Sequence, residues 1–139
     1  MPLLDVLEFY KKNYLGFFPD ITVIVVSVND NYTRIKRDLP QLLELNKELG
    51  TKSILVDEAK FYYSEKDDAD MVEVHGLMAR IGSRYNVISL PLHDYLKKVD
   101  QLEQGVLWWD MVHFTDYGHK VVSDWLTPEI GKIWKPSQR

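Results

Sequence analysis

Apolar positions recur along the chain with two different spacings, one typical of helices and one typical of buried strands. In residues 2–14 they stand three and four apart with charged residues between them, which predicts an amphipathic helix. Residues 21–27 are mostly valine and isoleucine, which predicts a strand buried on both faces, as in parallel sheets. The two patterns then alternate to the end of the sequence.

The rest of the chain divides in the same way. Helices are predicted over residues 33–49, 69–84, 94–99 and 116–134, and strands over residues 53–56 and 86–90. Gly50 is expected to end the helix that precedes it. Proline lacks the backbone N–H and its ring clashes with the preceding helical turn. We therefore expect a break or a late start at Pro40 and a bend or a split at Pro128.

Alternating helices and strands predict an α/β fold built from parallel crossovers. The expected architecture is a three-layer αβα sandwich with a short parallel sheet, flavodoxin-like in type. A length of 139 residues fits a single domain, residues 1–139. In such sheets the ligand site lies beyond the carboxyl ends of the strands. Two polar segments, residues 27–31 and 110–118, are predicted to meet at that edge.

The composition of the sequence argues against several classes of function. The sequence has no cysteine, which excludes disulfides, thiolate metal sites and a cysteine nucleophile among these residues. Its net charge of -4 and the lack of a basic stripe argue against a nucleic-acid partner. No apolar run approaches the ~20 residues that span a bilayer, and the first residues do not resemble a secretory signal. We therefore expect a cytoplasmic protein that needs no membrane and no cofactor.

One short segment carries residues suited to acid–base chemistry. Residues 110–119 read D-M-V-H-F-T-D-Y-G-H, with Asp110 three positions before His113 and Thr115 placed to cap a helix. A carboxylate beside an imidazole accepts the proton of one ring nitrogen, so that the other nitrogen can act as a general base. Asp110 and His113 are therefore candidate members of a catalytic triad.

This segment resembles the final block of the SGNH (GDSL-type) hydrolases, which is written D-x-x-H and is followed by a helix. The third block of that family, G-x-N-D after a buried strand, is similar to S-V-N-D at residues 27–30. The resemblance covers residues 19–126. It implies an SGNH-like fold and an esterase, lipase or acetylesterase type of activity on a small acyl ester or an acylated sugar.

The resemblance also implies a role for each matching residue. Asp110 corresponds to the triad acid, His113 to the general base and Asn29 to the side chain that donates to the oxyanion. Ser27 stands where the family has the glycine of its third block. Trp109 directly precedes the motif and is expected either to wall an acyl or sugar pocket or to pack in the core.

The family's first block, a strand that ends in G-D-S and supplies the serine nucleophile, has no counterpart in this sequence. The matching part therefore corresponds to a domain that is truncated at its amino end. Without that serine, a catalytically inactive binding or regulatory module is the alternative function. A sheet that lacks two of about five strands has an uncovered edge, so we expect a homo-oligomer, a partner segment that completes the sheet, or a rebuilt edge.

Each candidate residue also has an ordinary structural explanation. Asp110 and His113 can cap the last helix, Asn29 can form a turn, and Ser27 can either end a strand or act as a substitute nucleophile. A third function is a metal-dependent hydrolase, whose ligands recur every three residues: Asp110, His113, Asp116 and His119. A loop that turns into a helix midway through this set would keep the four side chains from sharing one face.

Overall fold

The computed structural model of the chain describes residues 3–13, 19–26, 31–58, 65–99, 105–110 and 113–134, with the backbone alone at 65–68. The named elements follow in the order α1 (Leu3–Asn13), β1 (Ile21–Val26), α2 (Tyr32–Glu48), β2 (Lys52–Asp57), α3 (Glu65–Arg84), β3 (Ile88–Leu90), α4 (Leu92–Leu96) and α6 (Asp116–Ile133). Among the described helices, none has both the length and the apolar character needed to cross a bilayer.

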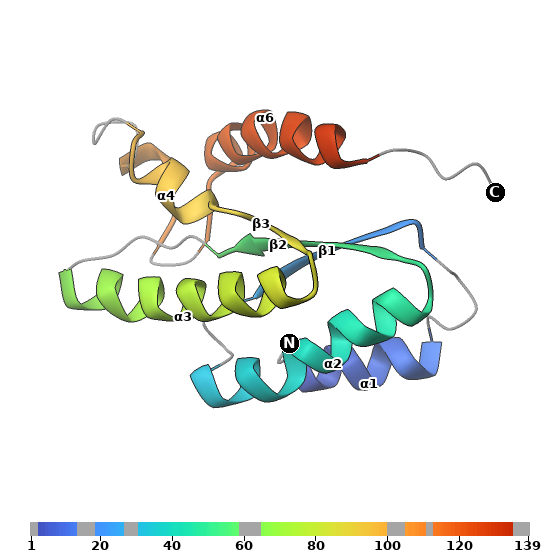
Figure 1. The fold of residues 1–139 in the computed structure, drawn as a ribbon. Helices are drawn as coiled ribbons and strands as arrows, with labels where there is room; N and C mark the ends of the chain where they lie inside the picture. Colours follow the sequence, from blue (N-terminus) through green and yellow to red (C-terminus); the bar gives the residue numbers. More distant parts are fainter. Residues whose placement is uncertain are drawn as a thin grey trace.

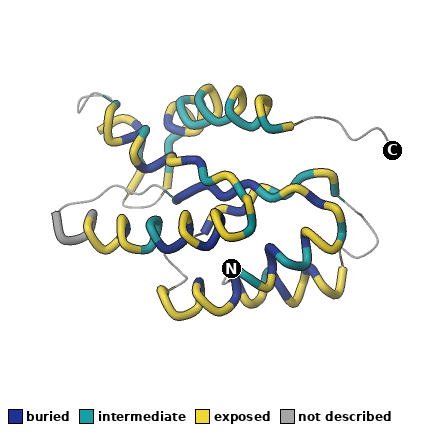
Figure 2. The backbone as a smooth tube through the Cα atoms, viewed as in Figure 1, coloured by how far each residue is buried: buried dark blue, intermediate teal, exposed yellow. Residues whose placement is uncertain are grey.

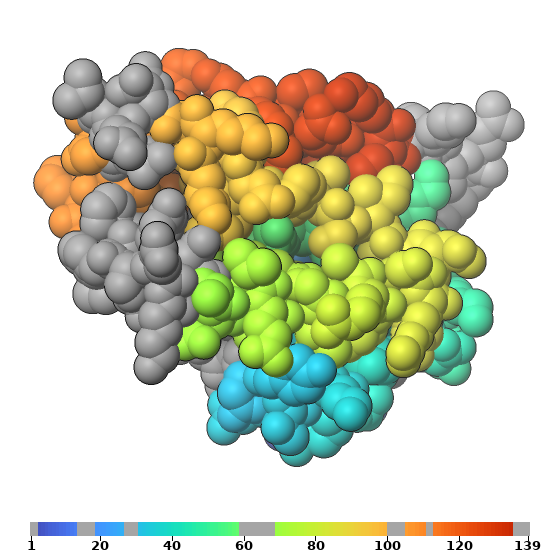
Figure 3. Space-filling view, turned by 60° about the vertical axis from the view of Figure 1, so that its left-hand side comes forward, coloured from blue at the N-terminus to red at the C-terminus, as the bar shows by residue number. Residues whose placement is uncertain are grey.

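The three strands form one parallel sheet in the order β1-β2-β3. Figure 1 shows α1, α2 and α3 on one side of this sheet and α4 with α6 on the other. On the face seen in Figure 3, α3 lies between α2 and the pair α4 and α6. The predicted three-layer α/β sandwich with a short parallel sheet is thus confirmed.

The central strand β2 is buried on both faces. Ile54, Leu55 and Val56 are all 0% exposed, and Figure 2 shows buried backbone concentrated at the centre of the sheet. Leu55 belongs to a core cluster with side chains of α1, α2 and α3, whereas Ile54 and Val56 belong to a second cluster with side chains of α4 and α6. Successive side chains of a strand point to opposite faces, so an apolar β2 requires a helical layer on each side. Full burial of each such side chain stabilises the fold by about 1.5–3 kcal/mol.

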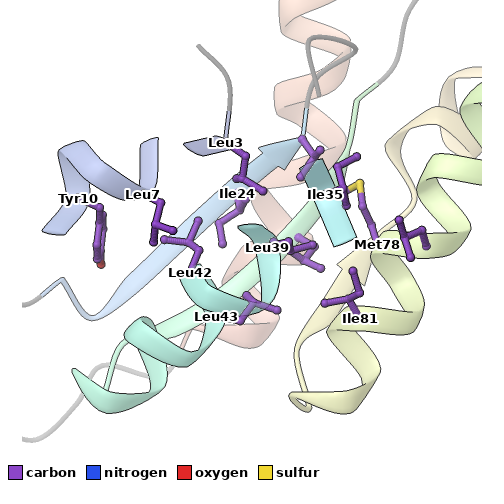
Figure 4. Packing of buried hydrophobic residues seen from close by; sticks show 13 residues of the cluster. Leu3, Leu7, Tyr10, Ile24, Ile35, Leu39, Leu42, Leu43, Met78 and Ile81 are labelled. Atoms are coloured by element: carbon purple, nitrogen blue, oxygen red, sulfur yellow. The ribbon is translucent and has the colours of Figure 1, made fainter. Parts of the chain in front are cut away.

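The helical layer formed by α1, α2 and α3 packs on the sheet mainly through leucine and isoleucine side chains. Figure 4 shows Leu7 of α1 and Leu42 of α2 beside Ile24 of β1. Leu39 and Ile35 of α2 continue this cluster and are both 0% exposed. The cluster explains why α1 and α2 lie side by side on one face.

The prediction of a break at Pro40 is wrong, because α2 runs without interruption from Tyr32 to Glu48. A proline inside a helix costs about 3 kcal/mol, and the buried apolar face of α2 outweighs that cost. Asn31 begins the helix by accepting a hydrogen bond from the Arg34 backbone N–H at 3.0 Å. Gly50, with φ of 69°, follows its end as predicted.

Other boundaries differ from the predictions at element ends. Helix α6 is continuous through Pro128, so the predicted split is wrong. Asn86 adopts a left-handed φ of 56°, which directs the chain out of α3 and delays the third strand to Ile88. The helix expected at residues 94–99 is α4, which begins two residues earlier, at Leu92.

A buried carboxylate joins β2 to α4. Asp57, at the carboxyl end of β2, accepts a backbone hydrogen bond from His93 at 3.0 Å and a second from Leu92. It therefore caps α4, whose own N-cap residue makes no side-chain hydrogen bond. The His75 Nδ1 atom lies 3.8 Å from the Asp57 Oδ2 atom. Burial raises the pKa of Asp57, with the two backbone hydrogen bonds opposing that shift.

The raised pKa of Asp57 predicts a specific pH dependence of stability. The folded state binds this proton more tightly than the unfolded chain, whose carboxyl pKa is about 3.9. The contribution of Asp57 to the free energy of unfolding is therefore largest below about pH 4 and falls as pH rises through the folded pKa. Urea unfolding of the wild type and Asp57→Asn should be measured from below about pH 4 to higher pH. As pH rises, the free energy of unfolding of the wild type should fall relative to that of the variant. A relative stability that rises with pH would contradict this account.

Candidate active site

The segment before α6 folds back on itself and holds two polar side chains at its turn. Trp108 and Phe114 form an isolated antiparallel bridge. The Trp109 N–H donates to the His113 carbonyl at 2.8 Å, and the Thr115 N–H donates to the Leu107 carbonyl at 2.9 Å. These backbone bonds close the segment and place Asp110 and His113 at its turn.

Hydrogen bonds join the start of α6 to the same segment. Thr115 is the N-cap residue, and its hydroxyl accepts a hydrogen bond from the Gly118 N–H at 3.0 Å. That hydroxyl also donates to the Val106 carbonyl at 2.7 Å. A Cβ atom at Gly118 would overlap the Leu107 carbonyl oxygen, so only glycine permits this close approach.

Aromatic and aliphatic packing supports the segment from beneath. Leu107 is 0% exposed and joins the cluster between the sheet and α6. Trp108 stacks on Phe114 with ring centroids 4.1 Å apart. The His119 ring meets Phe114 edge-on at 5.6 Å. The backbone beneath Asp110 and His113 is therefore held by core contacts on its inner side.

Asp110 and His113 contact each other directly. The His113 Nδ1 atom lies 2.7 Å from Asp110 Oδ2 and 3.0 Å from Oδ1, and the His113 N–H donates to Oδ1 at 2.9 Å. An ionised carboxylate only accepts hydrogen bonds, so Nδ1 carries the ring proton. The neutral imidazole therefore presents its Nε2 lone pair away from Asp110, as a general base requires.

The pair lies at the carboxyl edge of the sheet. Ile133, at the end of α6, shares a cavity of about 440 Å³ with Lys52 and Ile88 at the starts of β2 and β3. Because α6 runs back along the sheet, its first residue lies at the opposite, carboxyl edge. Figure 1 shows the segment before α6 at the end to which the β2 arrow points. This is the edge at which α/β sheets bind ligands.

The pair is also open to solvent, since the side chains of Asp110 and His113 are 54% and 73% exposed. Trp109 is 75% exposed. Of the two neighbouring tryptophans, Trp108 is the one that packs in the core, while Trp109 stands free on the surface next to Asp110. A ligand therefore has access to His113 and Trp109 together.

The two remaining candidate residues, Ser27 and Asn29, lie outside the described residues. Strand β1 ends at Val26 and α2 is capped by Asn31, so residues 27–30 connect these two elements. Their roles at the oxyanion or as a nucleophile stay predictions.

A metal centre has no geometrical support in the described part of the chain. Within it, no group of three or more His, Cys, Asp and Glu side chains is arranged to hold an ion. Of the four residues that recur every three positions, His119 packs on Phe114 and Asp116 begins α6. The turn from loop to helix separates them from Asp110 and His113.

Two structural residues were missed by the sequence analysis. Asp57 follows a buried strand, but nothing in the sequence shows that it caps a helix that begins at Leu92. Gly118 lies within the motif at residues 110–119, which by itself gives it no structural role. A glycine in the first turn of a helix, where glycine is unfavourable, is a signal that could have indicated its close contact with Leu107.

No protein-family model matches the sequence, and no curated protein matches it. Solved structures do match its fold. Axe2, an acetylxylan esterase from Geobacillus stearothermophilus, is 18% identical with a TM-score of 0.77, over 100% of this chain and 71% of that one. A Parabacteroides merdae protein described as a GDSL-like lipase is 19% identical with a TM-score of 0.81, over 94% and 69%. The chain therefore has the SGNH-like fold that the resemblance predicted.

Several of the matching Axe2 structures are variants. Three are described as catalytic mutants, in which a serine, an aspartate or a histidine is replaced by alanine. In Axe2 the aspartate and the histidine are three positions apart, and another variant replaces the tryptophan directly before that aspartate.

The contact at Gly118 predicts a stability difference between two glycines of the same helix. Gly118→Ala should lower the free energy of unfolding by about 1–3 kcal/mol, because the new methyl group displaces the Leu107 backbone. Gly131→Ala is the matched control, since a Cβ there meets nothing within 4 Å. It should raise the free energy of unfolding by about 0.5–1 kcal/mol through helix propensity. Equal effects in urea unfolding would show that the contact with Leu107 does not constrain α6.

Proposed function

We propose that this chain carries the acid–base residues of an SGNH-type carboxylic-ester hydrolase that acts on acylated sugars or similar small esters. The observation that carries the proposal is the 2.7 Å contact between Asp110 and His113 Nδ1 at the carboxyl edge of the sheet. Asp110 orients the ring and stabilises its protonated form, and His113 Nε2 is the general base.

Axe2 supports these assignments. Its catalytic aspartate and histidine have the same spacing as Asp110 and His113, and its mutated tryptophan has the position of Trp109. In this chain Trp109 offers an exposed indole face beside the pair. Aromatic faces supply large rigid contact areas, so Trp109 is assigned to the acyl or sugar part of the substrate.

The reaction proceeds in two transfers. A serine hydroxyl attacks the ester carbonyl carbon while His113 Nε2 takes its proton, and the oxyanion forms against the Asn29 side-chain amide. His113 then gives that proton to the departing alcohol as the C–O bond breaks, leaving an acyl-serine. Water attacks the acyl-serine with His113 again as base, which releases the acid and restores the serine. These steps require no cofactor.

A second candidate is a binding or regulatory module that does not turn over substrate. The absence of a G-D-S block from this sequence favours it. In this case ligand binding persists and no residue of the pair matters for hydrolysis. The two candidates differ in what His113→Ala changes.

The proposed function predicts that the pair accelerates hydrolysis of an activated ester even without the family serine. Initial rates with p-nitrophenyl acetate should fall at least about tenfold in His113→Ala, since general-base catalysis contributes about 10²–10⁴ in complete sites. Asp110→Asn should also lower the rate, because Asn no longer favours the proton on Nδ1 or stabilises the imidazolium. His119→Ala, which removes another exposed histidine nearby, is the control and should leave the rate unchanged.

Equal rates in wild type and His113→Ala would contradict the proposed function and leave the binding module. The same proteins can be treated with a fluorophosphonate and weighed intact by mass spectrometry. A stoichiometric adduct on Ser27 that disappears in His113→Ala would identify Ser27 as the nucleophile. No adduct is expected if the serine comes from outside these residues.

A further inference from the structure

A cavity of about 300 Å³ lies between α3 and α4, where β2 and β3 end. Its polar lining consists of Asp57, His75, Ser89 and Asp94, which come from β2, α3, β3 and α4. Figure 3 shows this face of the molecule, with α3 and α4 on the two sides of the cavity. Neither residue of the candidate pair before α6 lines it.

The strand register brings the polar side chains to one face of the sheet. Ser89 of β3 is paired in register with Leu55 of β2, which belongs to the core cluster on the α3 side. Side chains alternate along a strand, so Asp57, two positions after Leu55, points to the same face. His75 of α3 meets it there, with 3.8 Å between His75 Nδ1 and Asp57 Oδ2. Three separate elements thus supply adjacent polar groups.

The inner wall of the cavity is fixed in place. The side chains of Asp57 and His75 are only 10% and 12% exposed. The carboxylate of Asp57 accepts backbone hydrogen bonds from His93 and Leu92, which hold its orientation. A carboxylate that is already ordered loses little conformational entropy when it binds a ligand.

The charge of the lining is unbalanced. Burial raises the pKa of Asp57, and the charge of Asp94 adds to that rise, which places the two carboxylates close to each other. His75 can supply at most one positive charge against these two. No lysine or arginine is among the described lining residues. A cation inside the cavity would therefore offset the cost of keeping both carboxylates ionised.

We propose that this cavity binds a primary alkylammonium group, whose nitrogen contacts the carboxylates of Asp57 and Asp94 and whose alkyl chain lies against the apolar lining. That apolar lining includes Val72, Ala79 and Pro91. A volume of about 300 Å³ is at the lower end of ligand sites, which suits a small molecule. The assignment is independent of the proposed function, because it uses neither residue of the candidate pair.

The donors and acceptors of the lining favour a primary ammonium over other cations. Such a group donates three hydrogen bonds, which matches two carboxylates and the Ser89 hydroxyl. A quaternary ammonium has no N–H to donate and is recognised by aromatic faces, whereas the imidazole of His75 is the one ring in the described lining. A metal ion is disfavoured, since no described group of three His, Cys, Asp or Glu side chains is arranged to hold one.

The proposal is tested by titrating n-butylammonium chloride into the ¹⁵N-labelled chain at constant ionic strength. Saturable shifts are expected at the backbone amides of Asp57, His75 and Ser89. Affinity for 1-butanol and for tetramethylammonium should be at least about tenfold lower, because the first has no charge and the second has no N–H donor. Saturable binding of Zn²⁺ or Ca²⁺ at these amides without binding of n-butylammonium would overturn the proposal.

Substitutions at the cavity give the second part of the test. Asp94→Asn should lower the affinity for n-butylammonium at least about tenfold, because a charged hydrogen-bond partner is lost. Asp57→Asn should have the same effect, and its side-chain oxygen can still cap α4. Asp70→Asn is the matched control, since it removes the same charge from an exposed position of α3 outside the lining. It should leave the affinity unchanged.

Arg80 distinguishes a cation site from an anion site. Its guanidinium passes close to Gly76, a lining residue, without itself lining the cavity. Arg80→Gln should leave the affinity for n-butylammonium unchanged or raise it, because it removes a neighbouring positive charge. Tighter binding of butyrate than of n-butylammonium, weakened by Arg80→Gln, would overturn the proposal. So would the absence of saturable shifts, or equal effects of Asp94→Asn and Asp70→Asn.

A lysine side chain of another protein carries the same group as a free amine. Nα-acetyl-lysine methylamide has the alkylammonium group attached to a peptide backbone and therefore separates the two sources. We expect it to bind more weakly than n-butylammonium, because the cavity is small. Equal or tighter binding would assign the cavity to a lysine side chain, and the ammonium site stands in both cases.

Discussion

The burial of both faces of β2 is the constraint on which the arrangement of the molecule depends. Water does not reach three consecutive side chains of this strand, Ile54, Leu55 and Val56, which are 0% exposed. One helical layer must therefore cover each side of the sheet. The layer of α4 and α6 brings the end of α6 to the starts of the strands. The segment before α6 is thereby placed at the carboxyl edge, where a parallel sheet presents its ligand site.

The residues that the structure describes contain two contacts between aspartate and histidine side chains, and these contacts differ in their surroundings. Asp57 is buried, and its carboxylate caps α4 through backbone N–H groups, with His75 at 3.8 Å. Asp110 contacts His113 at 2.7 Å in a segment whose outer side is open to solvent. The second pair is exposed at a turn, whereas the first is largely buried beside a cavity of about 300 Å³ and joins two elements of the scaffold.

The candidate pair and one strand of the sheet are both exposed to solvent. A reactive site gains from the exclusion of water, because charges interact more strongly in a medium of low dielectric constant. Here His113 is largely exposed, and so is Val25 on β1. In the described residues, water therefore has access both to this pair and to part of β1.

The sequence by itself determined the fold class, the order of helices and strands, and the candidate pair Asp110 and His113, because apolar spacing and a four-residue motif are local properties. The continuation of α2 through Pro40 depended on tertiary packing, since the burial of Ile35 and Leu39 outweighs the local cost of proline. The reason that α6 needs Gly118 also lies in a distant contact, the carbonyl of Leu107. Which aspartate serves the scaffold and which one faces solvent was decided by the sheet, because burial arises only when separate segments pack together.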